Sequence, residues 1–352
     1  MNYHDLKIGI VGAGAVGVSL AVALTHAGYN VELVCEESNC ICIGNSKVYS
    51  IFGDFGDMSY LVPTVTNIKD FSSKKDFIIF ATKAYDTINL VKDAIPQLSK
   101  VGAIVTIQNA FCIDRLMKVI PRDKSICMYL DIYCKSFPLG KLVINSNGLT
   151  LGVYDKNAFS KMKVLKHVLD DICNVNLTNN VFGFILGRNI LSAAIALLGA
   201  ISGLQLGKIL KNKRGKFLFN KIIEEAMYVM KKYRIKVLPY NNQLDYYLFT
   251  SRDLKGLKYN KDMINVLRKN NRNIRSSLLT DIEKGRKTEL EFILGNFYNY
   301  SSKSKSQTPY INAIYKMVKE IEEGTRRVHK NAFLDEALNI SNDYKKTQHY
   351  DD

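Results

Sequence analysis

The chain has 352 residues, 47% hydrophobic and 23% charged, which is long enough for two globular domains and excludes a predominantly disordered protein. No apolar run reaches the roughly 18 residues of a membrane span, and the longest, 190–206, is predicted to be a buried helix. Lys and Arg outnumber Asp and Glu by 49 to 33, giving +16. This charge is compatible with nucleic-acid or membrane contact. However, no nucleic-acid-binding motif accompanies it, and a solvated basic surface is the simpler interpretation.

The cysteines and histidines indicate neither a disulfide framework nor a metal site. Seven cysteines occur, an odd number, and no two have C-x-x-C spacing. Together with an N-terminus that lacks a signal-peptide pattern, this is typical of reduced thiols in a cytoplasmic protein, which is the location we expect. The five histidines are scattered, so we predict no metal ligands.

The first elements carry the strongest motif. An apolar run at 6–11 predicts a strand, and small residues over about 15–27 predict a helix. The segment that joins them reads Gly12-Ala13-Gly14-Ala15-Val16-Gly17. In such a G-x-G-x-x-G motif, Gly12 allows the tight turn, Gly14 lets a pyrophosphate approach, and Gly17 lets the helix pack on the strand. Free N–H groups at the helix start would hold the phosphates, so the motif predicts a dinucleotide site.

The next strand bears on which dinucleotide binds. A strand is predicted over 31–35 and is followed by Glu36. In dinucleotide folds the residue at this position meets the adenosine ribose. A carboxylate there accepts a hydrogen bond from a 2′-hydroxyl and repels a 2′-phosphate, so Glu36 favours NAD over NADP. The alternative is that Glu36 is a solvated loop residue.

Two further strands end in polar residues. The continuous apolar runs 76–82 and 103–107 are typical of buried parallel strands. Lys83 follows the first run and Asn109 closely follows the second. Open α/β sheets bind their ligands at the carboxyl ends of strands, so we predict that both residues contact the ligand. The alternative is that each is merely a cap at a strand end.

The remaining pattern defines the fold class. Helices are predicted over 86–98, with Asp86 as N-cap, and over 157–172; strands are predicted within 40–66 and around 125–134 and 141–153. This alternation predicts an α/β protein with an N-terminal Rossmann-type, mostly parallel sheet. From Phe182 onward the pattern is helical, which predicts a second, all-α domain.

We place the domain boundaries from these changes in pattern. The expected domains are a Rossmann dinucleotide-binding domain at 1–179, a helical substrate and dimerisation domain at 180–323, and a polar, loosely held C-terminal tail at 324–352. Within the second domain, the Lys-, Asn- and Tyr-rich stretch 230–273 is interpreted as a surface elaboration.

Four segments together resemble one known family. They are the motif at 12–17, Thr82-Lys83-Ala84-Tyr85, Ile107-Gln108-Asn109, and the C-terminal pair Ser276-Ser277-Leu278-Leu279-Thr280-Asp281 and Arg286-Lys287-Thr288-Glu289-Leu290-Glu291. Over residues 6–322 the chain resembles the ketopantoate reductases (2-dehydropantoate 2-reductases). These are NADP-dependent enzymes of pantothenate biosynthesis with an N-terminal Rossmann domain and a helical C-terminal domain. The resemblance therefore implies an NAD(P)-dependent oxidoreductase acting on CH–OH groups.

The resemblance also implies residue roles. It implies that Lys83 and Asn109 contact the cofactor and that Asn109 also meets the substrate. It implies that Ser277 binds the substrate carboxylate. Glu289 is implied to lie beside both the cofactor and the catalytic group.

The chain departs from the family pattern along the long helix. Arg188 stands where the family has a lysine, Ser192 and Ala196 replace two asparagines, and Leu197 and Leu206 replace a proline and a further asparagine. Positions four residues apart share one helix face, so the first three changes fall on one surface. An arginine can polarise a carbonyl but stays protonated, so it is a poor proton donor. The predicted catalytic residues are accordingly Arg188 and Glu289, with Ser192 counted among the substrate-binding residues.

Two hypotheses remain open. The first is NAD(P)H-dependent reduction of a 2-oxo acid, ketopantoate or a different carbonyl compound, with Glu289 holding Arg188 or the cofactor. The second is a non-catalytic NAD(P)-binding sensor. We expect NADP or NAD as cofactor and a small-molecule 2-oxo acid as partner, with a homodimer as one option. We expect neither a membrane nor a nucleic-acid partner.

Overall fold

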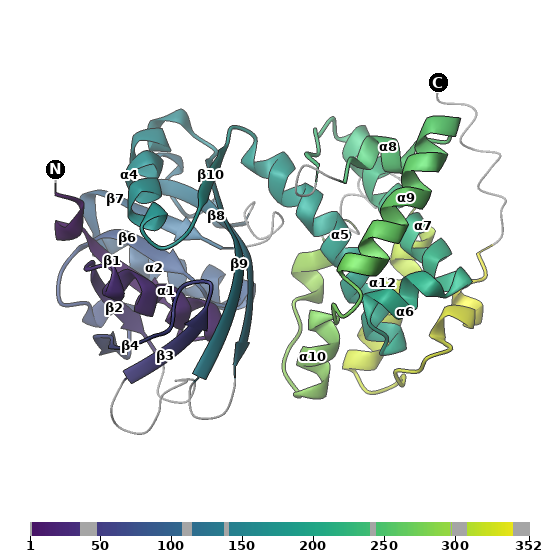
Figure 1. The fold of residues 1–352 in the computed structure, drawn as a ribbon, viewed down its shortest axis with the longest axis horizontal. Coiled ribbons are helices and arrows are strands. Elements are labelled where there is room, and N and C mark those ends of the chain that lie inside the picture. Colours follow the sequence, from purple (N-terminus) through teal and green to yellow (C-terminus); the bar gives the residue numbers. More distant parts are fainter. Residues whose placement is uncertain are drawn as a thin grey trace. The chain divides into compact units, whose positions relative to one another are not determined.

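The computed structural model describes residues 2–35, 48–107, 115–136, 141–239, 244–295, 297 and 308–340. The chain divides into two compact units, residues 1–185 and 186–352 (Figure 1). From the sequence we expect a domain boundary at 179/180; the division between the two compact units falls inside the long helix α5, Val181–Ser202.

Unit 1 is built on one sheet. Its strands are β1 Lys7–Val11, β2 Asn30–Val34, β3 Val48–Gly53, β4 Met58–Leu61, β5 Thr64–Val65, β6 Lys75–Phe80, β7 Leu98–Thr106, β8 Ser125–Ser136, β9 Lys141–Val153 and β10 Val175–Thr178. They are ordered β4-β3-β9-β8-β7-β6-β1-β2-β5, and β10 also pairs with β9. All pairs are parallel except β3–β4 and β8–β9, which confirms the predicted mostly parallel sheet.

Helices cover this sheet. They are α1 Ala15–His26, α2 Ala84–Ala94 and α4 Phe159–Asp170. Residues 17–24 of α1 are all buried, because its small side chains let the helix lie close to the strands. One hydrophobic core joins α1 and α4 to side chains of β1, β2, β7 and β9.

The start of α2 differs from the prediction. The helix begins at Ala84 with Lys83 as its N-cap, so Asp86 lies inside the first turn. Backbone hydrogen bonds, and not a side-chain cap, begin this helix. The Lys83 carbonyl accepts hydrogen bonds from the N–H groups of Asp86 and Thr87, at 3.1 and 3.0 Å. The helix therefore starts directly after the strand.

The expectation of reduced thiols is wrong for one cysteine. Cys35, directly after β2, is disulfide-bonded, and its partner is not among the described side chains. Cys127 and Cys173 are free thiols. A disulfide depends on the distance between sulfur atoms in space, which the C-x-x-C spacing rule does not capture.

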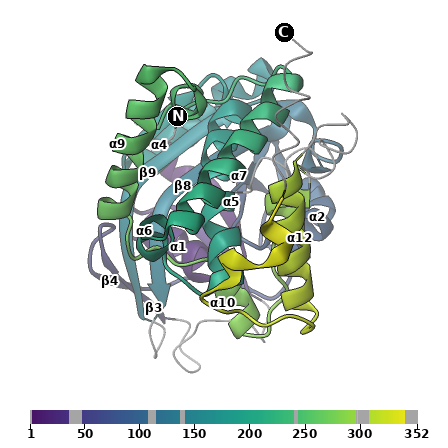
Figure 2. The same ribbon diagram turned by 90° about the vertical axis from the view of Figure 1, so that its right-hand side faces the viewer.

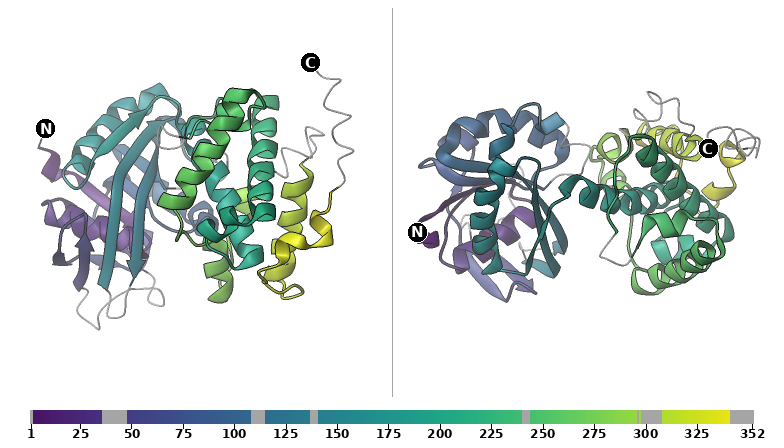
Figure 3. Two further views of the ribbon diagram at one scale, coloured as in Figure 1. Left: turned by 45° about the vertical axis from the view of Figure 1, so that its right-hand side comes forward. Right: turned by 90° about the horizontal axis from the view of Figure 1, so that it is seen from above.

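Unit 2 is helical, as predicted. Besides most of α5 it contains α6 Leu206–Lys211, α7 Lys213–Lys232, α8 Tyr246–Thr250, α9 Leu254–Asn270, α10 Ser277–Glu283, a π-helical turn Glu291–Gly295 and α12 Pro309–Glu322, then two short 3₁₀ turns, Ala332–Leu334 and Glu336–Leu338. Figures 1 and 3 show the strands in one unit and only helices in the other.

Helix α5 is the core of unit 2. It is long and apolar enough to span a membrane by length and composition, but 83% of its most apolar 18-residue window is buried inside the protein. It ends at Ser202, before Gly203, whose φ of +70° suits glycine. This confirms the expected buried helix.

The stretch 230–273 is more than a surface elaboration. Tyr246 and Phe249 of α8 are buried, and the Tyr246 hydroxyl donates a hydrogen bond to the Gly187 carbonyl of α5. A Cβ on Gly187 would lie 2.2 Å from the Leu238 carbonyl oxygen, so the segment packs directly on the core helix there. Tyr246, one of the tyrosines expected at the surface, is therefore a buried residue that holds this stretch against α5.

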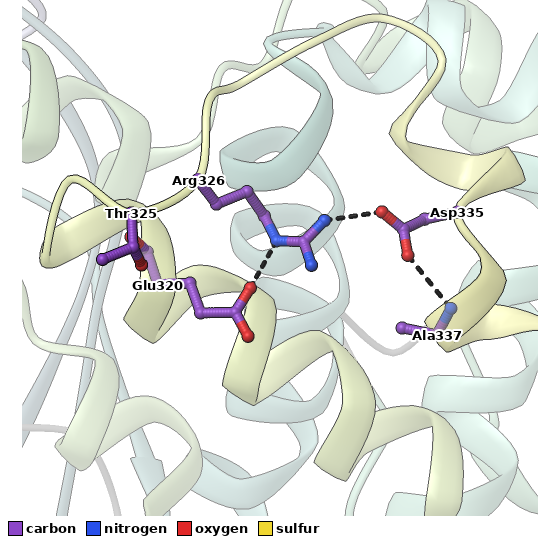
Figure 4. Close-up of polar contacts among 5 residues, drawn as sticks. All are labelled: Glu320, Thr325, Arg326, Asp335 and Ala337. Atoms are coloured by element: carbon purple, nitrogen blue, oxygen red, sulfur yellow. Dashed lines mark hydrogen bonds and ion pairs between the residues drawn. The ribbon is translucent and has the colours of Figure 1, made fainter.

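The expected loosely held tail is packed as far as residue 340. Phe333 and Leu338 are buried, and the Arg214 guanidinium of α7 donates to both of their carbonyl oxygens. Figure 4 shows the Arg326 guanidinium between the carboxylates of Glu320 and Asp335. The two hydrogen bonds that it donates to them are each 2.5 Å long. The segment reads as polar because its few apolar residues are far apart in sequence. Residues 341–352 lie outside the described part of the chain.

Candidate functional site

The glycine motif forms a tight loop between β1 and α1. Gly12 has φ of +106°, and a Cβ on it would lie 2.7 Å from the Thr82 methyl carbon. A Cβ on Gly17 would lie only 1.9 Å from the Gly12 carbonyl oxygen. Both positions therefore require glycine, as the motif predicts.

Gly14 differs from the other two glycines. It is the N-cap of α1 without a side-chain cap, and a Cβ on it would meet no atom within 4 Å. The space above Gly14 is open, and the first N–H groups of a helix have no intrahelical partner. An open cradle of backbone donors at a helix N-terminus fits a dinucleotide pyrophosphate, so the residues present suit the predicted cofactor.

The end of β6 lies beside this loop. The hydroxyl oxygens of Thr82 and Thr87 are 2.7 Å apart, and the Thr87 hydroxyl donates to the Lys83 carbonyl at 3.1 Å. These bonds fix the start of α2, whose N-cap is the half-buried Lys83. Because Thr82 also touches Gly12, the structure brings the strand end with Lys83 next to the glycine loop.

Two predicted cofactor residues lie outside the described residues. They are Glu36, just beyond β2, and Asn109, just beyond β7. The strands that lead to them end level with β1 and β6: Val34 pairs with Val11, and Thr106 pairs with Phe80. Their contacts with ribose, cofactor and substrate stay predictions.

In unit 2 the predicted catalytic face runs along α5. Arg188 is the single charged residue in the sequence of this helix and is 5% exposed. Ser192, one turn on, is exposed, and Ala196 is buried after a further turn. The helical rise places Arg188 and Ala196 about 12 Å apart along the axis.

Helix α10 is joined to the far end of this face. The Ser276 hydroxyl donates to the Ala196 carbonyl at 2.6 Å and accepts the Leu279 N–H at 3.1 Å as N-cap. A Cβ on Gly199 would lie 2.6 Å from the Ser276 Cβ, so this glycine allows the close approach. The exposed Ser277 therefore starts α10 beside the Ala196 end of the face.

The sequence alone indicates no role for Ser276. A serine directly before an apolar helical segment is an N-cap signal, and it could have located the helix start. Nothing in the sequence pairs that serine with α5.

Glu289 lies in the segment between α10 and the π-helical turn and is partly exposed. Its carbonyl accepts the N–H groups of Phe292 and Ile293, both at 2.9 Å. The neighbouring Thr288 hydroxyl accepts the Leu290 N–H and contacts the Glu322 carboxylate of α12. The segment is thus anchored to α12. That Glu289 holds Arg188 or the cofactor stays a prediction.

Known proteins match this chain over nearly its whole length. A sequence model described as "Ketopantoate reductase PanE/ApbA" matches residues 8–148, and "Ketopantoate reductase PanE/ApbA C terminal" matches 181–322. The 2-dehydropantoate 2-reductase of Aquifex aeolicus is 24% identical over 322 residues, 90% of this chain and 97% of that protein. The enzyme of the same name from Pyrococcus abyssi is 26% identical over 321 residues, 89% of this chain and 97% of that protein.

Solved structures show the same fold. A PanE/ApbA family ketopantoate reductase from Ralstonia eutropha JMP134 has a TM-score of 0.76 at 19% identity, covering 92% of this chain and 100% of that one. D-mandelate dehydrogenase with NADH and anilino(oxo)acetate has a TM-score of 0.75 at 17% identity, covering 91% and 99%. The two sequence models together span most of the chain, so it belongs to the ketopantoate reductase family, oxidoreductases that act on CH–OH groups and use NAD(P)H.

Proposed function

We propose that this protein reduces a 2-oxo acid with NAD(P)H. Two observations carry the proposal, one in each unit. Unit 1 has an open glycine cradle, and unit 2 has the α5 face with Arg188, Ser192 and the adjoining Ser277. The names of the curated relatives support a reductase of ketopantoate. D-mandelate dehydrogenase, with anilino(oxo)acetate bound, supports a wider range of 2-oxo acids.

The chain's own residues would hold the cofactor in unit 1. When bound, the reduced nicotinamide supplies the hydride. The N–H groups at the start of α1 would bind the pyrophosphate over Gly14, with Lys83 and Asn109 as further contacts. Glu36 favours NADH, since its carboxylate would repel a 2′-phosphate, and NADH-bound solved neighbours support this choice.

Arg188 would act on the substrate carbonyl. A guanidinium beside the carbonyl oxygen polarises it and stabilises the negative charge that develops as hydride arrives. Arginine keeps its proton at neutral pH, so water or another group must protonate the oxygen. Glu289 would hold Arg188 or the cofactor, while Ser277, Ser192 and Asn109 would position the substrate carboxylate and side chain.

Two kinds of 2-oxo acid are candidates for the substrate, and ketopantoate is the first. Ketopantoate would place the protein in cytoplasmic pantothenate biosynthesis. Ser192 and Ala196 offer fewer hydrogen bonds than the two asparagines of the family pattern, and each lost bond costs about 1 kcal/mol. A 2-oxo acid with a less polar side chain is therefore the second candidate.

Oxidation of NADH and NADPH with a panel of 2-oxo acids tests this function. The panel includes ketopantoate and aromatic and aliphatic 2-oxo acids. We expect turnover with at least one of them and a higher kcat/KM with NADH than with NADPH. No turnover above background with any panel member would contradict the proposal.

A non-catalytic NAD(P)-binding sensor is the second candidate function. The observation in its favour is the joint change to Arg188, Ser192 and Ala196 on one face of α5. It predicts that the protein binds NAD(P)H without turnover. It also predicts that the triple variant Arg188→Lys, Ser192→Asn, Ala196→Asn gains reductase activity, because the variant restores a lysine that can donate a proton and the two asparagines of the family pattern. The Ser276 hydroxyl binds the backbone carbonyl of residue 196, so the substitution there does not remove its acceptor. No gain in that variant would count against simple loss of the catalytic acid.

A further inference from the structure

The positive charge of this protein is concentrated in unit 2. Residues 186–352 hold 31 of the 49 basic and 17 of the 33 acidic residues, so +14 of the +16 lies there. Residues 252–275 alone carry eight basic and two acidic residues. This stretch contains α9, and none of the proposed catalytic or cofactor residues lies in it. The charge therefore calls for its own explanation.

Helix α9 is firmly attached through one face only. Gly256, Ile264 and Leu267 are buried on that side. A Cβ on Gly256 would lie 2.9 Å from the Leu248 carbonyl oxygen of α8, so the two helices are in close contact. The Tyr259 hydroxyl accepts the Asp245 N–H at 2.8 Å. Figure 2 shows α9 on the opposite side of α5 and α7 from α12.

The other face of α9 is exposed and combines lysines with leucines. Leu254 is 88% exposed and Leu257 is 57% exposed. Lys258, Lys261 and Lys269 are also exposed, and so is one acidic residue among them, Asp262. Residues three, four and seven apart share a helix face, so these two leucines, three lysines and one aspartate form one surface, which we call the α9 outer face. The leucines lie at its N-terminal end and the lysines continue along it.

We propose that the α9 outer face attaches the protein peripherally to an anionic phospholipid bilayer. Lysine ammonium groups near such a surface are attracted to its headgroups, each contributing about a fivefold gain in binding. The two leucines would enter the boundary between headgroups and acyl chains, which removes their apolar surface from water. This revises the expectation of no membrane partner, which rested on the lack of a membrane-spanning run.

A nucleic acid fits the same face less well. Nucleic-acid surfaces that bind single strands add aromatic side chains on which bases stack. The α9 outer face has none, since Tyr259 is turned towards Asp245. Two exposed leucines have no role against phosphates. The combination of charge and exposed aliphatic side chains therefore favours a bilayer.

Vesicle co-sedimentation of the full chain tests this inference. The probes are vesicles of phosphatidylcholine with 30% phosphatidylserine and vesicles of phosphatidylcholine alone. We expect binding to the first, weakened by salt, and at least tenfold less binding to the second. Lys258→Glu with Lys261→Glu should lower affinity at least tenfold, whereas the charge-matched Lys92→Glu with Lys100→Glu in unit 1 should change it less than threefold.

The leucines separate a bilayer from other anionic partners. Leu254→Ser with Leu257→Ser keeps every charge and should weaken vesicle binding about tenfold while leaving the thermal midpoint unchanged. Equal losses in the α9 and unit 1 charge variants would show a general charge effect and overturn the proposal. So would tight binding of a 20-nucleotide RNA or DNA duplex that depends on Lys258 and Lys261 but not on the leucines.

Discussion

The three motif glycines meet different surroundings, and this makes their roles separable. A Cβ on Gly17 would overlap the Gly12 carbonyl oxygen, whereas a Cβ on Gly14 would meet no atom within 4 Å. An added methyl group is thus a packing change at one position and a change in ligand access at the other. Both glycines follow the spacing rule, but only the structure tells these two consequences apart.

Gly14→Ala should weaken NAD(P)H binding at least tenfold with no change in thermal midpoint, because its Cβ would occupy only the space proposed for the pyrophosphate. Gly17→Ala is the matched control: its Cβ would overlap the Gly12 carbonyl, so it should lower the thermal midpoint by several degrees. Fluorescence titration of NADH and thermal unfolding measure both. Unchanged NADH affinity in Gly14→Ala would contradict the proposed pyrophosphate position.

Arg188 gives the second residue-scale prediction. Arg188→Ala should lower kcat for a 2-oxo acid by a factor of about 100 or more, the usual effect of removing a group that stabilises a developing oxyanion. NADH affinity should remain, because the proposed phosphate cradle lies in unit 1. Steady-state kinetics and NADH titration of the same preparation separate the two effects. A variant with wild-type kcat would remove Arg188 from the mechanism.

At the scale of elements, a buried carboxylate holds the start of α12. Glu225 of α7 accepts the N–H groups of Tyr310 and Ile311, at 3.0 and 2.8 Å. Burial raises the pKa of Glu225 to about 7, although both hydrogen bonds act in the opposite direction. The charged form of Glu225 is thus less favourable in the folded protein than in the unfolded chain.

Glu225 should therefore make folding stability depend on pH. Its pKa is higher in the folded than in the unfolded state, so its contribution is present at low pH and is lost as pH rises through about 7. Relative to Glu225→Gln, the wild type should lose up to about 1.4 kcal/mol per pH unit between pH 5 and 7. Urea unfolding of both proteins over this range measures the difference. Parallel stability curves, or a wild type that gains stability with pH, would contradict it.

The segment 325–340 is the second element with a testable role. It extends past the family match, which ends at residue 322. The His329 N–H donates to the Ile201 carbonyl near the end of α5, and Phe333 lies against Gly215 of α7. The Ala337 N–H and the Arg326 guanidinium hold the pKa of Asp335 below its ordinary value. With the bond from Arg326 to Glu320 of α12, these contacts connect the segment to α5, α7 and α12.

Truncation after Gly324 should lower the thermal midpoint of the protein by at least 5 °C, because it removes the buried side chains of Phe333 and Leu338 from the core of unit 2. Arg326→Ala should cost only about 1 kcal/mol, since its ion pairs are partly exposed. Removal of residues 341–352 alone is the control for shortening the chain. An unchanged midpoint in the truncation at Gly324 would show that the packed segment contributes nothing to stability.

At the scale of the whole molecule, the sequence predicts most of the fold. Continuous apolar runs predict β6 and β7, and glycine spacing predicts the β1–α1 loop, because burial and turn geometry act locally. The start of α2 is missed because the Lys83 carbonyl, and not a polar side chain, begins the helix. The packing of Tyr246 on Gly187 and of Phe333 on Gly215 is also missed, because it joins residues far apart in sequence.

The candidate site is predicted unevenly for the same reason. Local patterns predict the glycine loop and the strand end at Lys83, and the structure has both. Ser277 follows only from the family resemblance, and the roles of all these residues stay predictions. The Ser276 contact with Ala196, which joins α10 to α5, has no sequence signature. The proposed role of Arg188 follows from its side chain and from its place on the long apolar helix, both of which the sequence shows. That the side chain is only 5% exposed is seen only in the folded unit.

Transfer of deuterium from 4-deuterated NADH to the substrate tests the central claim most directly. The protein is incubated with the labelled NADH and the most active 2-oxo acid of the panel, and the product is analysed by mass spectrometry and NMR. We predict a 2-hydroxy acid with one deuterium at C2 for each NADH consumed, when the label is on the transferred face. A protein that binds NADH but forms no 2-hydroxy acid, or a product without deuterium from either labelled face, would contradict it.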